Sequence, residues 1–432
     1  MTPGSGFVAI DFGTSNSAVA LPQPGGGVRL VALEPGQPTM PTAVFYRADS
    51  PPQQLEANRL YGRAALAAYV EGIDGRLMRS MKSILGSSLL DQSTDIGGGR
   101  AVRYRDVVVG YLRELKKRAE AEAGHRVNRA VLGRPVFFVD DDPARDAQAQ
   151  AALEAAARQA GFTDLQFQYE PIAAALDFES GVTQECLVLV ADIGGGTSDF
   201  SLVRVGPARR GRAQRRDDIQ ANHGVHLAGT DFDRHVELAC ILPLLGYGTL
   251  RPAKPGEAAR EVPSGVYFDL ATCHLINTVY APGRVAELRG MKAWYTEPRH
   301  HARLMVTVQE RLGHALAAAA ERAKIDVAQQ GVAAVDLGML ESGLHSALQE
   351  TQAAAAIEAD LARIVDAAEL TVKMAGVDAV RVQALYFTGG STGLTALVDR
   401  IAARFPAAQQ VRGDRFASVA QGLGLHARAV FG

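Results

Sequence analysis

Two segments of the chain place an aspartate at the end of an apolar stretch, followed by small residues and a second, alternating stretch. The first reads FVAIDFGTSNSAVAL at 7–21 and the second LVLVADIGGGTSDFSLV at 187–203, so Asp11 and Asp192 occupy equivalent positions. The alternation predicts a strand on each side of each loop, and therefore two hairpins. A dinucleotide-binding turn is excluded, because such a turn opens a helix and neither loop is followed by a helical pattern.

Each glycine-rich hairpin tip has the composition of an anion site. Backbone N–H groups can converge on a phosphate there, since glycine leaves no side chain in the way. A carboxylate beside a triphosphate makes sense only with a cation between them, and Mg²⁺ prefers oxygen ligands and keeps several waters. The pattern predicts that Asp11 and Asp192 hold a magnesium nucleotide; the alternative for each is an acid that caps its own turn. The glycine runs 25–27 and 97–99 follow no strand-terminal aspartate and are interpreted as ordinary turns.

The matched segments also predict the architecture. Asp192 follows Asp11 by 181 residues in a chain of 432 residues. Such a repeat favours two similar lobes that face each other, and the chain length favours two domains of about 200 residues each.

Local signals predict several further elements. Asp142 and Pro143 open a long helix that Gly161 closes, and the strand in LQFQYEP delivers Glu170 to the start of the next helix. The six arginines within 204–218 could suggest RNA binding, but the absence of interleaved aromatic residues favours a solvated hairpin tip. The remaining expectations are helices over 59–70, 76–85, 309–330 and 344–374, a loop over 92–99, an irregular insertion over 243–303, and a strand, Gly-Gly and helix over 384–406.

Charge and cysteine content argue against several classes of protein. The chain has 45 Lys and Arg against 47 Asp and Glu, and its net charge of -2 gives no global attraction to nucleic acid or an anionic membrane. Its three cysteines, Cys186, Cys240 and Cys273, are far apart, which argues against a zinc site or a disulfide framework. No leader segment and no stretch of about 18 apolar residues is present. These features predict a soluble protein of the reducing cytoplasm.

Together the motifs resemble the ATPase domain of the 70-kDa heat-shock chaperone (Hsp70/DnaK) family, within the actin-like superfamily. IDFGTSNSAVA and DIGGGTSDFS look like the two phosphate loops of the family, and YEPIAAALDFE is similar to the segment with its catalytic glutamate. AERAK and TGGST resemble its adenosine motifs, and GDRFASVAQGLGLHA resembles its second lobe connection. Within the family, VLGRPVFF, FQYEPIAAALDFE and LPLLGYG look most like the YegD-like chaperones, which consist of the ATPase domain alone.

The resemblance implies an α/β, actin-like fold of the duplicated ribonuclease H-like kind, with ATP and Mg²⁺ in a cleft between two lobes. Lobe I would comprise 1–184 and 412–432, and lobe II would comprise 185–411 with the insertion. Asp11 and Asp192 would hold Mg²⁺ mostly through water. The nucleotide contacts that the resemblance implies are Gly13, Thr14, Ser15, Asn16, Gly194, Gly195, Gly196 and Thr197 at the phosphates, Glu321 and Lys324 at the ribose, Gly389, Gly390 and Ser391 at the adenosine, and Asp414 at the lobe connection.

The resemblance also assigns catalytic roles. Lys82, in MKSILG, would reach the transferred phosphate and offset the charge that develops in the transition state. Glu170 and Asp199 would orient or deprotonate the attacking water, and Thr197 would lie near the γ-phosphate. The implied reaction is slow hydrolysis of ATP to ADP and phosphate.

Two departures from the family pattern bear on function. Ile325 and Gly393 stand where two arginines commonly flank the adenine, and Ala328 stands where a serine often contacts the base. Cation–π stacking contributes about 0.5–2 kcal/mol per contact, so adenine affinity or base selectivity is expected to differ. The chain also stops at Gly432, before the position of the family's peptide-binding domain, which predicts that it does not clamp client peptides in the usual way.

The sequence therefore predicts a chaperone-type ATPase with an unidentified protein partner or co-chaperone. A nucleotide-sensing module with little or no turnover is one alternative. A small-molecule kinase of the same superfamily is another, although the sequence carries no signature of a substrate pocket.

Overall fold

The computed structural model describes residues 6–23, 25, 27–49, 59–97, 99–139, 142–212, 214–252, 258–272, 275–414 and 417–432. It divides into two compact units, Met1–His226 with Val365–Gly432, and Leu227–Ile364. The first unit contains two large sheets, and each unit is described by itself. The predicted division into lobes at 184/185 and 411/412 stays a prediction.

The first sheet carries the first of the two matched segments. Its strands are β1 (Gly6–Phe12), β2 (Asn16–Pro22), β3 (Val28–Leu30), β4 (Thr39–Pro41), β10 (Val127–Arg134) and β11 (Asp164–Tyr169). The order is β3-β2-β1-β10-β11, with β4 also paired to β2. Strand β1 runs antiparallel to β2 and parallel to β10, so the expected hairpin at Asp11 is confirmed.

The second sheet repeats this arrangement. Its strands are β12 (Cys186–Ile193), β13 (Ser198–Val205), β14 (Ile219–Val225), β17 (Ala384–Thr388) and β18 (Gln409–Arg412), in the order β14-β13-β12-β17-β18. Strand β12 is antiparallel to β13 and parallel to β17, as β1 is to β2 and β10. The internal repeat inferred from the sequence is therefore a repeat of sheet topology.

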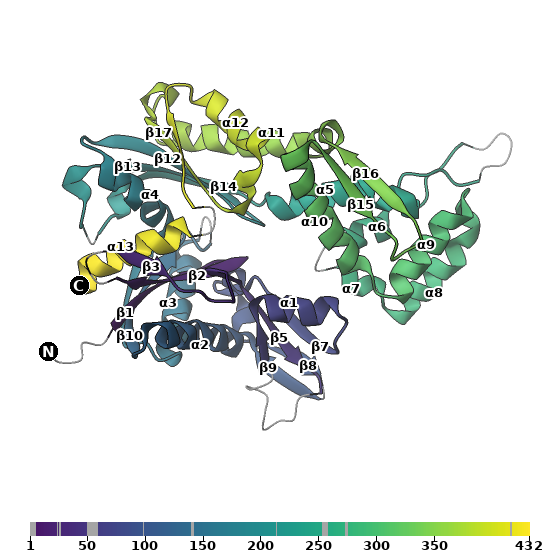
Figure 1. Ribbon diagram of the computed structural model, residues 1–432, viewed down its shortest axis with the longest axis horizontal. Coiled ribbons are helices and arrows are strands. Elements are labelled where there is room, and N and C mark those ends of the chain that lie inside the picture. Colours follow the sequence, from purple (N-terminus) through teal and green to yellow (C-terminus); the bar gives the residue numbers. More distant parts are fainter. Residues whose placement is uncertain are drawn as a thin grey trace. The chain divides into compact units, whose positions relative to one another are not determined.

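Two helices connect the sheets within the first unit. They are α4 (Glu170–Gly181) and α13 (Ser418–Phe431). Helix α13 lies against β1, β2, β3 and β10, while α4 contacts β12 and β13 (Figure 1). The helices cross closely at Gly422, where any Cβ would lie 1.8 Å from the carbonyl oxygen of Ala173. Apolar residues of both sheets and both helices form one hydrophobic core, which includes Val131, Val188 and Leu423.

Other helices cover the sheets or follow them. Helices α2 (Tyr104–Ala123) and α3 (Pro143–Gln159) pack against the first sheet in a separate core. The side chain of Asp142 accepts a hydrogen bond from the Arg145 N–H at 3.0 Å, so the expected cap of α3 is confirmed. The further elements of this unit are β5 (Ala43–Arg47), β6 (Arg59–Tyr61), α1 (Gly62–Val70), β7 (Gly75–Arg79), β8 (Ser93–Gly97), β9 (Arg100–Arg103) and α12 (Thr395–Arg404).

Two secondary-structure predictions in the first unit are wrong, and the helix expected over 59–70 begins only at Gly62, after β6. The helix expected over 76–85 is strand β7 followed by the short 3-10 helix Met81–Ile84, because Ser80 between them has a left-handed φ of 54°. The loop expected over 92–99 contains β8, which pairs with β9 in a small hairpin. The glycines suggested a loop because they form only the turn of this hairpin: Gly97 and Gly99 both adopt positive φ, which is the conformation of a tight turn.

The second unit corrects the prediction of an irregular insertion at 243–303. Its described residues form four α-helices and one short 3-10 helix over 265–309. Pro282 and Pro298 each stand at a first helical position, a signal that the sequence offered. The helix expected over 344–374 begins at Glu350, after a strand. The elements are α5 (Gly229–Cys240), α6 (Gly265–Leu270), α7 (Ile276–Val279), α8 (Pro282–Gly290), α9 (Pro298–Gln309), α10 (Gly313–Gln330), β15 (Val332–Asp336), β16 (His345–Gln349) and α11 (Glu350–Met374), which continues into the first unit.

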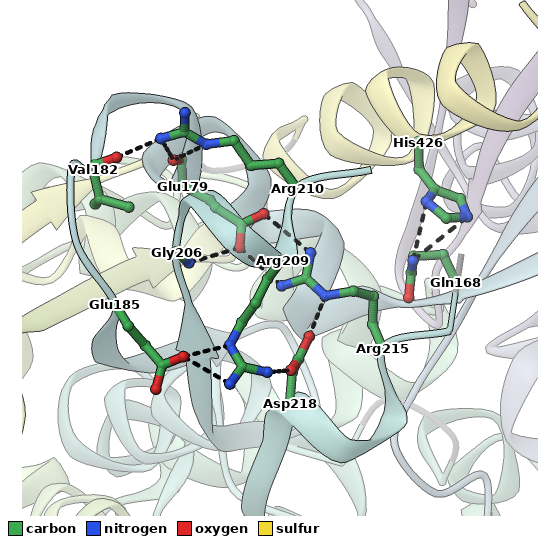
Figure 2. Close-up of polar contacts among 10 residues, drawn as sticks. All are labelled: Gln168, Glu179, Val182, Glu185, Gly206, Arg209, Arg210, Arg215, Asp218 and His426. Carbon is green, nitrogen blue, oxygen red and sulfur yellow. Dashed lines mark hydrogen bonds and ion pairs between the residues drawn. The ribbon is translucent and has the colours of Figure 1, made fainter. Parts of the chain in front are cut away.

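The arginine-rich segment 204–218 joins the antiparallel strands β13 and β14, so the expected hairpin is confirmed, but it is not solvated throughout. Arg215 is 3% exposed and Glu179, in the last turn of α4, is 1% exposed. The guanidinium of Arg215 donates two hydrogen bonds to the Glu179 carboxylate at 2.9 and 3.0 Å, and the Gly206 N–H donates a third at 3.0 Å (Figure 2). A buried arginine needs such a paired, bidentate carboxylate, so this segment is folded onto the end of α4.

Neighbouring side chains extend this network. Asp218 accepts from both Arg215 and Arg209, and Arg209 also donates to Glu185 at 2.7 and 2.9 Å (Figure 2). Arg210 donates to the carbonyl oxygens that end α4. Two arginines, Arg209 and Arg215, are thus matched by three carboxylates, and Arg210 is matched by backbone carbonyl groups. Charge pairing within the fold therefore explains Arg209 and Arg215, whereas Arg212 and Arg216 are exposed.

Replacement of Arg215 by Met should destabilise the protein by about 3–5 kcal/mol, because it leaves the buried carboxylate of Glu179 without its cation. The matched control is Arg212→Met, since Arg212 lies on the same segment but is exposed. Unfolding in denaturant measures both. Equal midpoints for the two variants would show that the ion pair does not hold the segment.

His426 gives the stability of the protein a pH dependence. It lies on α13, is 7% exposed, and its Nδ1 accepts from the Gln168 amide at 3.2 Å (Figure 2). Burial, and then the nearby Arg215, lowers the pKa of His426. The unfolded chain therefore takes up a proton near the ordinary pKa of about 6.5 while the folded protein does not, so stability falls as the pH drops through that value. In His426→Gln, the loss of unfolding free energy between about pH 7.5 and about pH 5.5 should be smaller than in wild type.

Among the residues that the structure describes, no helix combines the length and apolar content that a membrane crossing requires. Cys186 and Cys240 are buried free thiols whose pKa values are raised by burial, and Cys273 lies outside the described residues.

Candidate functional site

The two matched aspartates stand at the same place in their sheets. Asp11 lies near the end of β1, opposite Ala18 of β2. Asp192 lies near the end of β12, between Asp199 of β13 and Thr388 of β17. Each aspartate therefore precedes its glycine-containing loop directly, as the sequence predicted.

Lys82 and Glu170, which are 88 residues apart, form an ion pair in this region. The Lys82 ammonium donates to Oε1 of Glu170 at 2.5 Å, and the side chains are only 9% and 14% exposed. The 3-10 helix after Ser80 presents Lys82, and the first residue of α4 presents Glu170. The structure thus places in contact a lysine and a glutamate to which the sequence resemblance had assigned roles in the same reaction.

Electrostatics links this ion pair to both aspartates. Burial, and then the charge of Glu170, raises the pKa of Asp11 to about 8, and Lys82 offsets only part of this rise. Burial and the neighbouring Asp199 and Glu170 raise the pKa of Asp192 to about 7. Burial alone would lower the pKa of Lys82, but the surrounding carboxylates outweigh it and hold this pKa above its usual value. Negative charge therefore exceeds positive charge here.

The donor set fits a hydrated magnesium ion. Within the described ranges, no group of three or more His, Cys, Asp or Glu side chains is arranged to hold a metal ion. Mg²⁺ does not require such a cage, because it keeps several waters and commonly uses one or two carboxylates. Burial and neighbouring carboxylates raise the pKa values of Asp11 and Asp192, and a divalent cation beside them would favour their ionised forms.

The second glycine loop is closed by its own backbone and by the predicted adenosine motif. The Gly194 N–H donates to the Thr197 carbonyl at 2.9 Å. The Ser391 hydroxyl donates to the Gly194 carbonyl at 2.6 Å. Gly389 has a φ of 89°, and a Cβ there would lie 2.4 Å from the Ile193 carbonyl oxygen, so only glycine fits. The structure therefore places the segment Gly389–Ser391 directly against the second glycine loop.

The connection that ends at Asp414 adjoins the same region. The hydroxyls of Thr388 and Ser418 donate to the Asp414 carbonyl, at 3.5 and 2.5 Å. This carbonyl therefore ties the end of β17 to the first turn of α13.

The predicted ribose residues lie in the second unit, on α10. Lys324 forms an ion pair with Asp233 of α5 at 2.6 Å and donates to the Gly229 carbonyl at 3.2 Å. Burial raises the pKa of Asp233 to about 6, although Lys324 lowers it. Glu321 is exposed, and Ile325 is 45% exposed. Whether Glu321 and Lys324 contact a ribose stays a prediction.

Sequence reasoning missed the glycines that make room for the acids. At Gly133 of β10, a Cβ would lie 3.1 Å from Cγ and 3.2 Å from Oε1 of Glu170. At Gly224 of β14, it would lie 2.5 Å from Oδ1 of Asp199. Both glycines stand inside strands, where an isolated glycine often marks such a close approach, so the signal was present in the sequence.

Two sheets of equal strand order, each ending its inner strand in an aspartate before a glycine loop, define an α/β protein of the actin-like ATPase fold class. The Hsp70 protein family matches residues 7–240, which is more than half of the chain. The chain therefore belongs to the Hsp70 family, and the fold class expected from the sequence is confirmed.

Two curated relatives agree with this assignment. The chain is 32% identical over 230 residues to the chaperone protein DnaK of Thermosipho melanesiensis, a match that covers 53% of this chain and 34% of the relative. It is 33% identical over 245 residues to the chaperone protein HscA homolog of Aromatoleum aromaticum, over 53% of this chain and 36% of the relative. The matches thus span about a third of the length of these chaperones.

Gly133→Ala should destabilise the protein by about 1–3 kcal/mol, because the added methyl group forces Glu170 or Leu423 to move. Gly181→Ala is the matched control. Gly181 is the last residue of α4, the helix that begins with Glu170, and a Cβ there meets nothing within 4 Å. Denaturant unfolding compares the two. A Gly133→Ala protein as stable as wild type would mean that Glu170 has room to move.

Proposed function

We propose that the protein binds Mg–ATP at its two glycine loops and slowly hydrolyses it to ADP and phosphate. The observation that carries this proposal is the shielded Lys82–Glu170 ion pair, with the raised pKa values of Asp11 and Asp192 beside it. An ion pair among excess carboxylates suits a substrate that brings phosphate charge together with a divalent cation. The Hsp70 family assignment supports the same substrate.

Each residue has a chemical task in this reaction. Lys82 offsets the charge that develops on the transferred phosphoryl group. A fixed cation stabilises this charge more strongly where water is largely excluded. Glu170 and Asp199 orient the attacking water and accept its proton, and Thr197 lies at the γ-phosphate. Asp11 and Asp192 would hold a hydrated Mg²⁺ ion, which would supply positive charge against the phosphates.

Hydrolysis of Mg–ATP by purified variants tests this function. Lys82→Met and Glu170→Gln should each lower the single-turnover rate by about a hundred-fold or more, because each removes a group that acts in the transition state. Asp192→Asn should raise the magnesium concentration needed for half-maximal rate. Lys117→Met is the control for Lys82, since the Lys117 side chain is 79% exposed. Rates equal to wild type in all three site variants, or no nucleotide binding by the wild type, would overturn the proposal.

A nucleotide-sensing module with little turnover is the second candidate. It is favoured by Ile325, an exposed aliphatic side chain at a position where the family commonly has an arginine against adenine. Tight Mg–ATP binding without detectable single-turnover hydrolysis would select this candidate.

The finer assignments belong to the same proposal. We place the chain among the YegD-like members of the family, on the motifs VLGRPVFF and LPLLGYG. We also propose that it acts in the cytoplasm with an unidentified protein partner or co-chaperone. The names of the two relatives, both chaperones, support the chaperone-type role.

A further inference from the structure

Thr42 lies beneath the first phosphate loop and holds two of its carbonyl groups. The Thr42 N–H donates to the Ser15 carbonyl at 2.9 Å, and the Thr42 hydroxyl donates to the Gly13 carbonyl at 2.8 Å. Thr42 follows β4, which pairs with β2 directly after the loop, and it is 1% exposed. A single buried residue therefore fixes both carbonyls through its backbone and its side chain.

A second hydroxyl group stands behind Thr42. The Ser17 hydroxyl, also 1% exposed, lies 2.9 Å from the Thr42 hydroxyl. Because Thr42 gives its only hydroxyl proton to Gly13, Ser17 must donate to Thr42. The result is a directed chain from Ser17 through Thr42 to the Gly13 carbonyl, in which each hydrogen bond strengthens the next.

The segment that carries Thr42 is anchored from another direction. The Tyr111 hydroxyl of α2 is within hydrogen-bonding distance of the Pro41 carbonyl at 3.0 Å and the Met40 carbonyl at 3.2 Å. Tyr111 and Met40 are both 0% exposed. The support beneath the loop is therefore part of the packed core of the first sheet.

Fixing these carbonyls also sets the direction of the N–H groups. In a trans peptide, the carbonyl and the following N–H point in opposite directions. With the Gly13 carbonyl turned to Thr42, the Thr14 N–H points to the other side of the loop, and no carbonyl dipole of Gly13 faces an anion there. Only glycine fits at this position of the loop, because a Cβ on Gly13 would lie 2.1 Å from the Asn16 carbonyl oxygen.

We propose that Thr42 is a positioning residue for nucleotide binding, which keeps the first loop in the orientation that receives phosphate. The inference rests on the proposed function, since it concerns the same ligand. Its ligand is the phosphate portion of Mg–ATP or Mg–ADP, and Thr42 acts through the loop without touching it.

The test compares Thr42→Val, which keeps the shape but removes the hydroxyl, with Thr42→Ser, which keeps the hydroxyl. Calorimetric titration measures the Kd of Mg–ATP and of adenosine for each variant. In Thr42→Val the Kd of Mg–ATP should rise about ten-fold, because the partly buried Gly13 carbonyl loses its donor and turns. The Kd of adenosine, which has no phosphate, should stay unchanged, and Thr42→Ser should bind Mg–ATP as wild type does.

Thr371→Val is the matched control. Thr371 is 0% exposed, and its hydroxyl donates to the Ala367 carbonyl at 2.8 Å within α11, so the substitution removes an equally buried bond from another part of the first unit. Its Kd for Mg–ATP should equal that of wild type. Denaturant unfolding of all variants shows whether Thr42→Val remains folded.

The outcomes separate the inference from the function on which it rests. Absence of Mg–ATP binding by wild type would overturn the proposed function. Binding by wild type with an unchanged Kd in Thr42→Val, or an equal loss for adenosine, would overturn the role of Thr42 alone. Should Thr42→Val not fold, Ser17→Ala removes only the donor behind Thr42. A raised Kd of Mg–ATP in Ser17→Ala supports the inference, and an unchanged one overturns it.

Discussion

The contact between Lys82 and Glu170 is the constraint on which the rest of the site depends. One ammonium group must compensate several carboxylates in a region that is largely shielded from water, and it compensates them only in part, as the raised pKa values of Asp11 and Asp192 show. Such a site is poised for a ligand that carries its own cation. The duplicated sheets satisfy this requirement by bringing one aspartate from each inner strand to the same ion pair.

Helix α4 connects this chemistry to the buried ion pairs of the second sheet. Its first residue, Glu170, holds Lys82, and Glu179 in its last turn holds Arg215. A helix of 12 residues is a stiff element, so the two carboxylates cannot move independently over its length. The contacts of α4 with strands β12 and β13 therefore help to fix the position of Glu170, in addition to its connection to β11, which precedes it.

Sequence alone predicted the elements whose signals are local and repeated. The strands around Asp11 and Asp192, the cap at Asp142 and the strand-to-helix position of Glu170 all follow from spacing and residue type, and the structure confirms them. The sequence could not reveal the strand at 75–79, because a single serine with a left-handed backbone, Ser80, interrupts an apparent helix. Nor could it reveal the burial of Arg215, which depends on a carboxylate 36 residues away. Thr42 was missed for the same reason, since its role comes from carbonyl groups of a distant loop.

The hydrogen-bonded arginines of the segment 204–218 also change what a protease would encounter. Six arginines within 204–216 give this segment one of the densest sets of tryptic sites in the chain. Three of them, however, are engaged as hydrogen-bond donors to acids and helix-end carbonyls. A protease needs an extended, detachable backbone, and here detachment requires buried charges to separate first. Cleavage at this segment would therefore report the integrity of the ion pairs and not the accessibility suggested by composition.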